Sequence, residues 1–327
     1  RISRSSARIL SVDIPSGIHS RTGQVMGTAV KADATVTFGY KKNGIVLYPG
    51  ASYAGKVTVA DIGIYGAEQL PRQTVMHLLT EEEMSWIPER PQGGNKGTFG
   101  KVLLLAGSKN MSGAAYLAAK AAFRTGCGMV RIATVPENRE ILQCMIPEAM
   151  LENGGAEAVE QASAWADVLA AGPGLGQSPE ALQKLKALLA AAGGKPVVLD
   201  GDALNLLAKE PELRSYKTGS WILTPHPGEL GRLLGKGTEE VLADLPEAAR
   251  QLAAAYGCIA VCKDAATVCA LPDAQIWVNT AGNDGMATAG SGDVLAGTAA
   301  GLLALGMEPE RAAPAAVLLH GKAGDLL

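Results

Sequence analysis

The feature that most constrains the fold of this chain is a repeated order of apolar run, glycine-bearing turn and helix-like segment. The first clear copy is the apolar run at residues 102–106, followed by Gly107 and Ser108 and by a small-residue segment at 113–125. A short apolar run bounded by turn residues indicates a buried strand. Strands that alternate with helical segments predict a doubly wound α/β domain, in which ligands bind at the carboxyl ends of the strands.

The same order continues along the chain. Further strands are predicted at residues 129–135, 168–171, 196–199, 221–223, 258–262 and 275–278. Helices are predicted at residues 157–163 and 179–192, and another begins at Asp202. Continuous apolar strands between helical segments indicate a mostly parallel central sheet with helices on both faces.

Composition agrees with an α/β protein that has neither a nucleic-acid nor a membrane partner. The 327 residues are 47% hydrophobic and 19% charged, with a net charge of −3 and no basic block. Nucleic acids and anionic membrane surfaces attract clustered Lys and Arg. No apolar run approaches the roughly 20 residues of a membrane span. No signal peptide is visible either. We expect a cytoplasmic protein on the basis of its cysteines.

The five cysteines are odd in number and mostly lie in apolar segments; they are Cys127, Cys144, Cys258, Cys262 and Cys269. We interpret them as reduced core thiols. Cys258 and Cys262 have the spacing of a metal-binding pair, but no second pair or histidine cluster completes a zinc site.

A glycine-rich turn near the C-terminal end is the strongest candidate for the chemistry. Residues 290–293, Gly-Ser-Gly-Asp, follow the predicted strand at 275–278 and precede an uncharged helical segment. The first N–H groups of a helix have no intrahelical partner, and glycines let phosphate oxygens approach them. Asp293 would lie in the first turn, where the helix dipole favours its charged form and where it could accept a proton from a substrate hydroxyl. The alternative is a plain glycine turn with an aspartate cap.

The run at residues 286–297, MATAGSGDVLAG, resembles the anion-hole motif of ribokinase-like enzymes, and most closely that of nucleotide-dependent NAD(P)H-hydrate dehydratases. The resemblance covers residues 80–327 and includes KGTFGKVLLLAGS, GAA, TPHPGE and the GSGD turn in the family's order. It implies a ribokinase-like α/β fold with a mostly parallel central sheet and helices on both faces.

The resemblance also implies two ligand sites. For the hydrated NAD(P)H substrate, it implies Ala114 or Ala115, Gly174, Gly176, His226 and Asp293. For the nucleotide, it implies Lys263, Asp264, Ala265, Ala266 and Thr267 together with Gly290, Ser291 and Gly292. His226 lies between two prolines that fix its backbone, and a purely structural hydrogen-bonding role is the alternative. Asp264 stands where the family has glycine, so either it faces solvent or it weakens nucleotide affinity.

Residues 1–66 contain three predicted strands, within residues 9–14, 34–38 and 56–64, without a long helix between them. So few helices cannot cover both faces of a parallel sheet, so this segment needs another protein surface. The motifs VDIPSG and KADATVTFG resemble the C-terminal part of a Rossmann-like NAD(P)H-hydrate epimerase domain. This resemblance implies Asp13 as a substrate-contacting acid and Ser16 as a ligand of K⁺; a turn-capping role is the alternative for Asp13. We do not expect this incomplete part to act as an epimerase alone.

The chain is therefore predicted to have three parts. Residues 1–66 form part of an epimerase domain, residues 67–79 form a linker, and residues 80–327 form the dehydratase domain. Thr80 and Glu83 have the spacing of a capping box, which indicates a short helix at the start of the last part.

The implied reaction converts the S form of NADH or NADPH hydrate back to NADH or NADPH. Asp293 would deprotonate the C6 hydroxyl as it attacks the terminal phosphoryl group of ADP, with ATP as an alternative, while the amides of residues 290–292 stabilise the developing charge. Mg²⁺ with the nucleotide, K⁺ in the epimerase part and a homo-oligomer are also expected. Two alternatives are a small-molecule kinase of the same fold and a non-catalytic nucleotide-binding protein.

Overall fold

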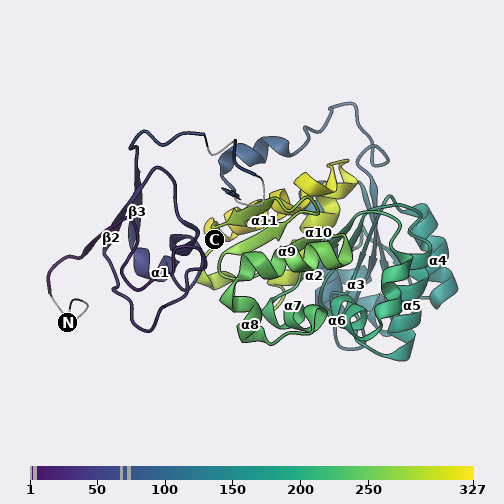
Figure 1. Cartoon of the computed structure of the whole chain (residues 1–327). Helices are drawn as coiled ribbons and strands as arrows, with labels where there is room; N and C mark the ends of the chain where they lie inside the picture. The colour runs from purple at the N-terminus through teal and green to yellow at the C-terminus, as the bar shows by residue number, and fades with distance from the viewer. Residues whose placement is uncertain (1, 3–5, 67–68, 72–74) are drawn as a thin grey trace.

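A computed structural model describes residues 2, 6–66, 69–71 and 75–327 (Figure 1). Its larger sheet has ten strands in the order β4-β13-β12-β11-β10-β9-β8-β5-β6-β7. All neighbouring strands are parallel except β11 with β12 and β12 with β13. The predicted mostly parallel sheet is therefore confirmed.

The strands of the larger sheet are β4 (Met76–Leu78), β5 (Lys101–Leu105), β6 (Met129–Ala133), β7 (Met150–Glu152), β8 (Val168–Ala171), β9 (Val197–Leu199), β10 (Trp221–Leu223), β11 (Ile259–Cys262), β12 (Thr267–Ala270) and β13 (Ile276–Asn279). The helices around it are α2 (Ser112–Thr125), α3 (Arg139–Met145), α4 (Ala156–Trp165), α5 (Pro179–Ala190), α6 (Gly201–Lys209), α7 (Pro227–Leu234), α8 (Thr238–Ala243), α9 (Leu245–Tyr256), α10 (Ser291–Ala304) and α11 (Pro309–Asp325).

Alternate residues of each strand pack into two different cores, because successive side chains of a strand point to opposite faces. Leu103 and Leu105 of β5 pack with the helices α4 to α9. Val102 and Leu104 pack on the other face with α2, α3, α10 and α11. Both faces of the sheet are thus covered, as the apolar strands predict. No helix in the described part of the chain is long and apolar enough to cross a bilayer.

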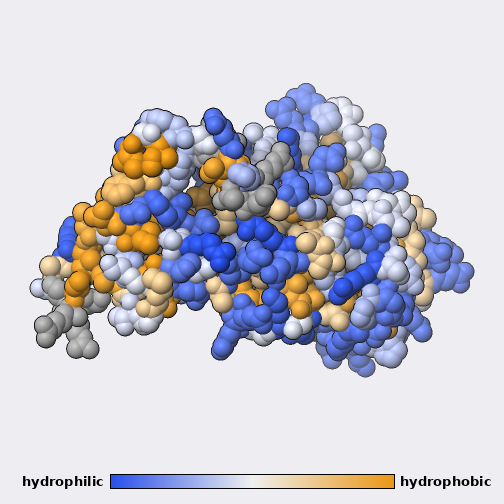
Figure 2. Space-filling view, in the orientation of Figure 1, coloured by the Kyte–Doolittle hydropathy of each residue, from blue (hydrophilic) through white to orange (hydrophobic). Residues whose placement is uncertain are grey.

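The N-terminal segment forms a separate three-stranded parallel sheet of β1 (Leu10–Val12), β2 (Ala34–Phe38) and β3 (Lys56–Ala60), with the short helix α1 (Ala51–Ala54). Leu10 and Val12 are more than 60% exposed. Figure 2 shows hydrophobic residues gathered on the surface of this segment. One side of the small sheet is open, as its lack of helices predicts.

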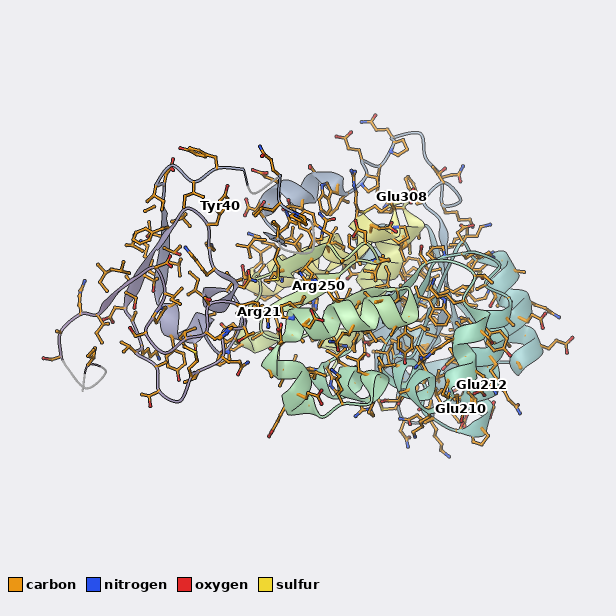
Figure 3. All side chains as sticks on the ribbon, viewed as in Figure 1. Arg21, Tyr40, Glu210, Glu212, Arg250 and Glu308 are labelled. Atoms are coloured by element: carbon orange, nitrogen blue, oxygen red, sulfur yellow. The ribbon has the colours of Figure 1, made fainter. Side chains whose placement is uncertain are left out.

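The N-terminal segment also contacts the larger domain. Leu47 is buried within the core of that domain. The side chain of Gln24 donates a hydrogen bond to the carbonyl of Leu242 at 2.9 Å. Arg21, labelled in Figure 3, forms an ion pair with Asp244 at 2.8 Å. The two parts are therefore joined by apolar and polar contacts.

Four expectations differ from the structure or are refined by it. Residues 76–78, expected within the linker, form β4 and extend the larger sheet next to β13. The third N-terminal strand ends at Ala60 instead of residue 64. Cys144 is exposed, so it is not a core thiol, whereas the other four cysteines are buried and free. The capping box of Thr80 and Glu83 is confirmed, although it begins a 3₁₀ helix at Glu81–Trp86.

Candidate active site

The carboxyl ends of neighbouring strands place the candidate residues in a row along one edge of the sheet. Lys263 follows β11, His226 lies three residues after β10, Asp200 follows β9, and Gly174 lies three residues after β8. Because these four strands are parallel neighbours, their ends meet at the same edge. The N-terminus of α10 brings Asp293 to this row, since the position of a Cβ on Gly292 would be 3.3 Å from Lys263 Nζ.

The start of α10 is fixed by close packing against α2. Gly290 has φ 94°, and a Cβ there would lie 2.5 Å from Leu117 Cδ1. About two turns further, a Cβ on Gly297 would collide with the carbonyl oxygen of Ala118. Only glycine fits at these two positions, and the loop amides are therefore held in one place.

Asp293 is a half-buried carboxyl group in the first turn of α10. Its pKa is raised to about 6, chiefly by burial and also by the negative charge of Asp200, while Lys263 opposes both effects. The expectation considered only the helix dipole, which favours the charged form, whereas the net shift of the pKa is upward because burial is its largest cause. A pKa of about 6 suits a general base, since the group is mostly ionised at neutral pH and still binds a proton well.

A buried ion pair next to Asp293 was not predicted as part of the site. Lys263 Nζ donates to Asp200 Oδ1 at 2.7 Å, and the hydroxyl of Thr224 donates to the same oxygen at 2.6 Å. The side chain of Asp200 is only 5% exposed. Asp200 thus fixes the ammonium group beside the glycine loop. The available sequence signal was an acid directly after a buried strand, at the edge where ligands bind.

A cavity of about 830 Å³ opens beside this row. It is lined by most of the predicted nucleotide residues, namely Lys263, Asp264, Ala265, Thr267, Ser291 and Gly292. Ala266 is buried below the surface of this turn, and Gly290 is partly buried at the start of α10. Asp264 is exposed. The volume lies in the range of ordinary ligand pockets.

His226 lines the same cavity and also caps α7. Its Nδ1 accepts a hydrogen bond from the backbone N–H of Gly228 at 3.1 Å. The backbone N–H of His226 donates to the side chain of Glu229 at 2.9 Å. Burial and the charge of Lys263 lower the pKa of the imidazole, which favours its neutral form. Since Nδ1 accepts a hydrogen bond, the proton of the neutral ring lies on Nε2, 3.5 Å from Oε1 of Glu229. The structural role is therefore present, and His226 also lines the cavity.

The other predicted substrate residues lie further along the sheet edge, away from this cavity. A Cβ on Gly174 would lie 2.9 Å from Ala114 Cβ, so the glycine loop packs against the start of α2. Ala115 is fully buried. Gly176 donates its N–H to Asp202 at 2.8 Å. The row thus runs from the Lys263 turn through Asp200 to this second group.

Asp13 and Ser16 lie in the N-terminal segment. Asp13 has a φ of 67° and accepts hydrogen bonds from Lys42 and Thr37, and the bond from Lys42 lowers the pKa of its carboxyl group. Strained backbone of this kind is often found at functional sites. The side chain of Ser16 is exposed.

Comparisons with known proteins agree with this geometry. A family model described as NAD(P)H-hydrate dehydratase matches residues 102–327, and a model of the YjeF-related protein N-terminus matches residues 1–44. The chain is 41% identical to a bifunctional NAD(P)H-hydrate repair enzyme of Thermofilum pendens, over 99% of this chain and 63% of that protein. It is 42% identical to an ADP-dependent (S)-NAD(P)H-hydrate dehydratase of Neisseria meningitidis, over 73% of this chain and 80% of that protein.

A solved structure of a dehydratase also matches this chain. The ADP/ATP-dependent NAD(P)H-hydrate dehydratase of Bacillus subtilis, co-crystallised with ATP and Mg²⁺, is 36% identical and has a TM-score of 0.68. That likeness covers 77% of this chain and 89% of the Bacillus subtilis chain.

Fold and comparisons together define a ribokinase-like α/β protein. Within that class, the chain belongs to the NAD(P)H-hydrate dehydratase family, whose model matches more than half of it. The chain spans less than two thirds of the length of the bifunctional relative from Thermofilum pendens.

Proposed function

We propose that this chain dehydrates the S form of hydrated NADH and NADPH at the expense of ADP, with release of AMP and phosphate. The observation that carries this proposal is the half-buried Asp293 in the first turn of α10, next to the ammonium group of Lys263. The ADP-dependent relative from Neisseria meningitidis supports ADP as the nucleotide.

Each residue of the site has a defined task in this reaction. Asp293 accepts the proton of the C6 hydroxyl group, whose oxygen attacks the β-phosphoryl group of ADP while AMP leaves. The amides of residues 290–292 and Lys263 stabilise the charge on the transferred phosphoryl group. Phosphate then departs from C6 with help from the ring nitrogen, and loss of a proton from C5 restores the dihydropyridine.

Magnesium belongs to the same proposal. Among the described residues, no group of three His, Cys, Asp or Glu side chains is placed to hold a metal alone. Mg²⁺ in nucleotide sites is usually bound by phosphates and one or two carboxylates. Asp264 and Asp284 line the cavity and would supply the protein ligands. When bound, the ion supplies positive charge to the nucleotide phosphates.

The N-terminal segment supports a further part of the proposal. We infer that residues 1–66 belong to an epimerase domain of a bifunctional protein, in which Asp13 contacts substrate and Ser16 binds K⁺. The match of residues 1–44 to the YjeF-related N-terminus supports this assignment. A cytoplasmic location and a homo-oligomeric state also remain proposals; the free cysteines agree with a reducing compartment.

A direct absorbance assay tests the dehydratase proposal. The chain is incubated with hydrated NADH, Mg²⁺ and either ADP or ATP, and recovery of the dihydropyridine absorbance is followed.

Asp293→Asn keeps the shape of the side chain but cannot accept the proton, so turnover should fall by about 10² to 10⁴. ADP affinity should change little. A variant that keeps more than about half of the activity would show that Asp293 is not the base. A stable phosphorylated product would instead identify a kinase.

A further inference from the structure

Two parts of the chain that are distant in sequence meet at the nucleotide cavity. Most of its lining comes from the larger domain, but Tyr48 comes from the N-terminal segment. Among the described residues that line the cavity, Tyr48 is the only phenylalanine, tyrosine or tryptophan. The N-terminal segment therefore supplies the one large aromatic ring of this site.

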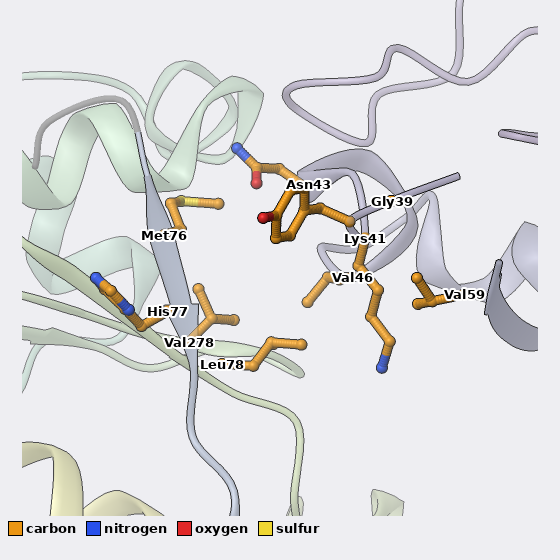
Figure 4. Close-up of a pocket in the computed structure, with 10 residues that line it drawn as sticks. Gly39, Lys41, Asn43, Val46, Val59, Met76, His77, Leu78 and Val278 are labelled. Atoms are coloured by element: carbon orange, nitrogen blue, oxygen red, sulfur yellow. The ribbon is translucent and has the colours of Figure 1, made fainter. Parts of the chain in front are cut away.

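Tyr48 is held in place by its neighbours. The preceding residue, Leu47, is 3% exposed and belongs to the core of the larger domain. A smaller cavity of about 260 Å³ lies where the segment meets the edge of the sheet, between Asn43 and Val46 on one side and β4 on the other (Figure 4). The ring of Tyr48 remains about half exposed. A fixed backbone with an open ring is suited to bind a ligand.

The order of strands indicates which part of a nucleotide Tyr48 would meet. Lys263 and the glycine loop mark the phosphate end, after β11. The N-terminal segment contacts the sheet edge at β4 and at Val278 of β13, and β13 is two strand positions from β11. Since neighbouring strands are about 4.8 Å apart, β11 and β13 are separated by roughly 10 Å. A nucleotide with its phosphates at Lys263 would therefore place its base toward Tyr48.

We propose that Tyr48 stacks on the base of the bound nucleotide, so that the N-terminal segment completes the nucleotide site of the larger domain. This inference rests on the proposed function, in which the cavity binds ADP. Aromatic rings bind nucleobases by stacking, independently of the contacts to phosphate. The phosphates and the base are thus held by two different parts of the chain.

Calorimetric titration of the full chain with ADP and with pyrophosphate tests the inference. Tyr48→Ala should weaken ADP binding about tenfold because the stacking contact is lost. Pyrophosphate has no base, so its affinity should stay within about twofold of wild type. Tyr48→Phe keeps the ring and should retain ADP affinity. Tyr65→Ala is the matched control, because Tyr65 is a more exposed tyrosine of the same segment that lies outside the cavity lining.

A second measurement guards against a folding defect in the alanine variant. Tyr48→Trp introduces a fluorescent ring at the same position, and ADP should quench the added emission whereas pyrophosphate should not. Thermal melts without ligand confirm that each variant is folded.

The outcomes separate this inference from the proposed function. Unchanged ADP affinity in Tyr48→Ala, or an equal loss in Tyr48→Phe, would overturn stacking while wild-type dehydration still supports the proposed function. A selective loss of ADP affinity in Tyr48→Ala, combined with a wild-type chain that does not dehydrate hydrated NADH, would support stacking and overturn the proposed function.

Discussion

At the residue scale, the site depends on the ion pair of Asp200 and Lys263. Its partners come from the ends of two strands and are 63 positions apart in sequence. The pair is nearly free of solvent on the Asp200 side, so removal of one partner leaves the other charge poorly compensated. Asp200 is a positioning residue, since it acts on the nucleotide through Lys263 and on Asp293 through its charge.

We predict that Asp200→Asn raises the KM for ADP about tenfold, because one charge-assisted hydrogen bond to Lys263 is lost. It should also shift the acid limb of the pH–rate profile to lower pH, since the charge of Asp200 helps to raise the pKa of Asp293. A role limited to stability would not move this limb. Steady-state kinetics between about pH 5 and 8 provide the measurement. Asp61→Asn, at an exposed position, is the control and should behave as wild type.

The raised pKa of Asp293 also has a consequence for stability. Its folded pKa of about 6 lies above the ordinary value of 3.8 for an aspartate, so the ionised group destabilises the folded state increasingly from pH 4 to pH 6 and by a constant amount above pH 6. Asp293→Asn removes this cost. After allowance for solvent screening, we expect a rise in Tm of about 2–4 °C near pH 7.5 and almost none near pH 4. Calorimetry without ligand tests this, and an equal rise at both pH values would contradict it.

At the scale of elements, the helices α2 and α10 each begin with residues that are predicted to bind a ligand. The glycine loop begins α10, and Ala114 lies in the first turn of α2. These helices approach closely because their facing residues are alanine and glycine.

We predict that Gly297→Ala destabilises the protein by about 1–3 kcal/mol, because the added methyl group meets the carbonyl of Ala118. Gly113→Ala, in α2 with open space around it, should be neutral or slightly stabilising. Chemical denaturation of both variants checks the prediction. Equal stability of the two variants would mean that the helix contact is less tight than described.

Much of the architecture could be predicted from the pattern of apolar runs. The strands at residues 168–171 and 221–223 match β8 and β10, because buried parallel strands have continuous apolar sequences. β4 could not be predicted, since three residues carry no periodicity and its pairing with β13 is tertiary. The GSGD turn indicated the place of Asp293, but its raised pKa depends on burial and on Asp200, which only the folded chain brings near.

At the scale of the whole molecule, Leu47 is the side chain of the N-terminal segment that is buried in the core of the larger domain. We predict that Leu47→Ala lowers stability by about 2–4 kcal/mol, because it removes a leucine from the core of the larger domain. The segment should also become sensitive to limited proteolysis. Leu10→Ala is the matched control, because Leu10 is 63% exposed. Similar digestion of the two variants would show that Leu47 does not anchor the segment.

The alanine- and glycine-rich contact of α2 with α10 has a thermal consequence. Alanine and glycine have no side-chain rotamers, so this contact loses almost no side-chain entropy on folding. Its alanine and glycine positions also have no alternative rotamers to adopt on warming, although Leu117 and Thr125 meet the contact at Gly290 and Gly301. The two helices are therefore expected to move as one rigid body, so that the distance between the glycine loop and the Ala114 end stays constant while the surrounding loops fluctuate.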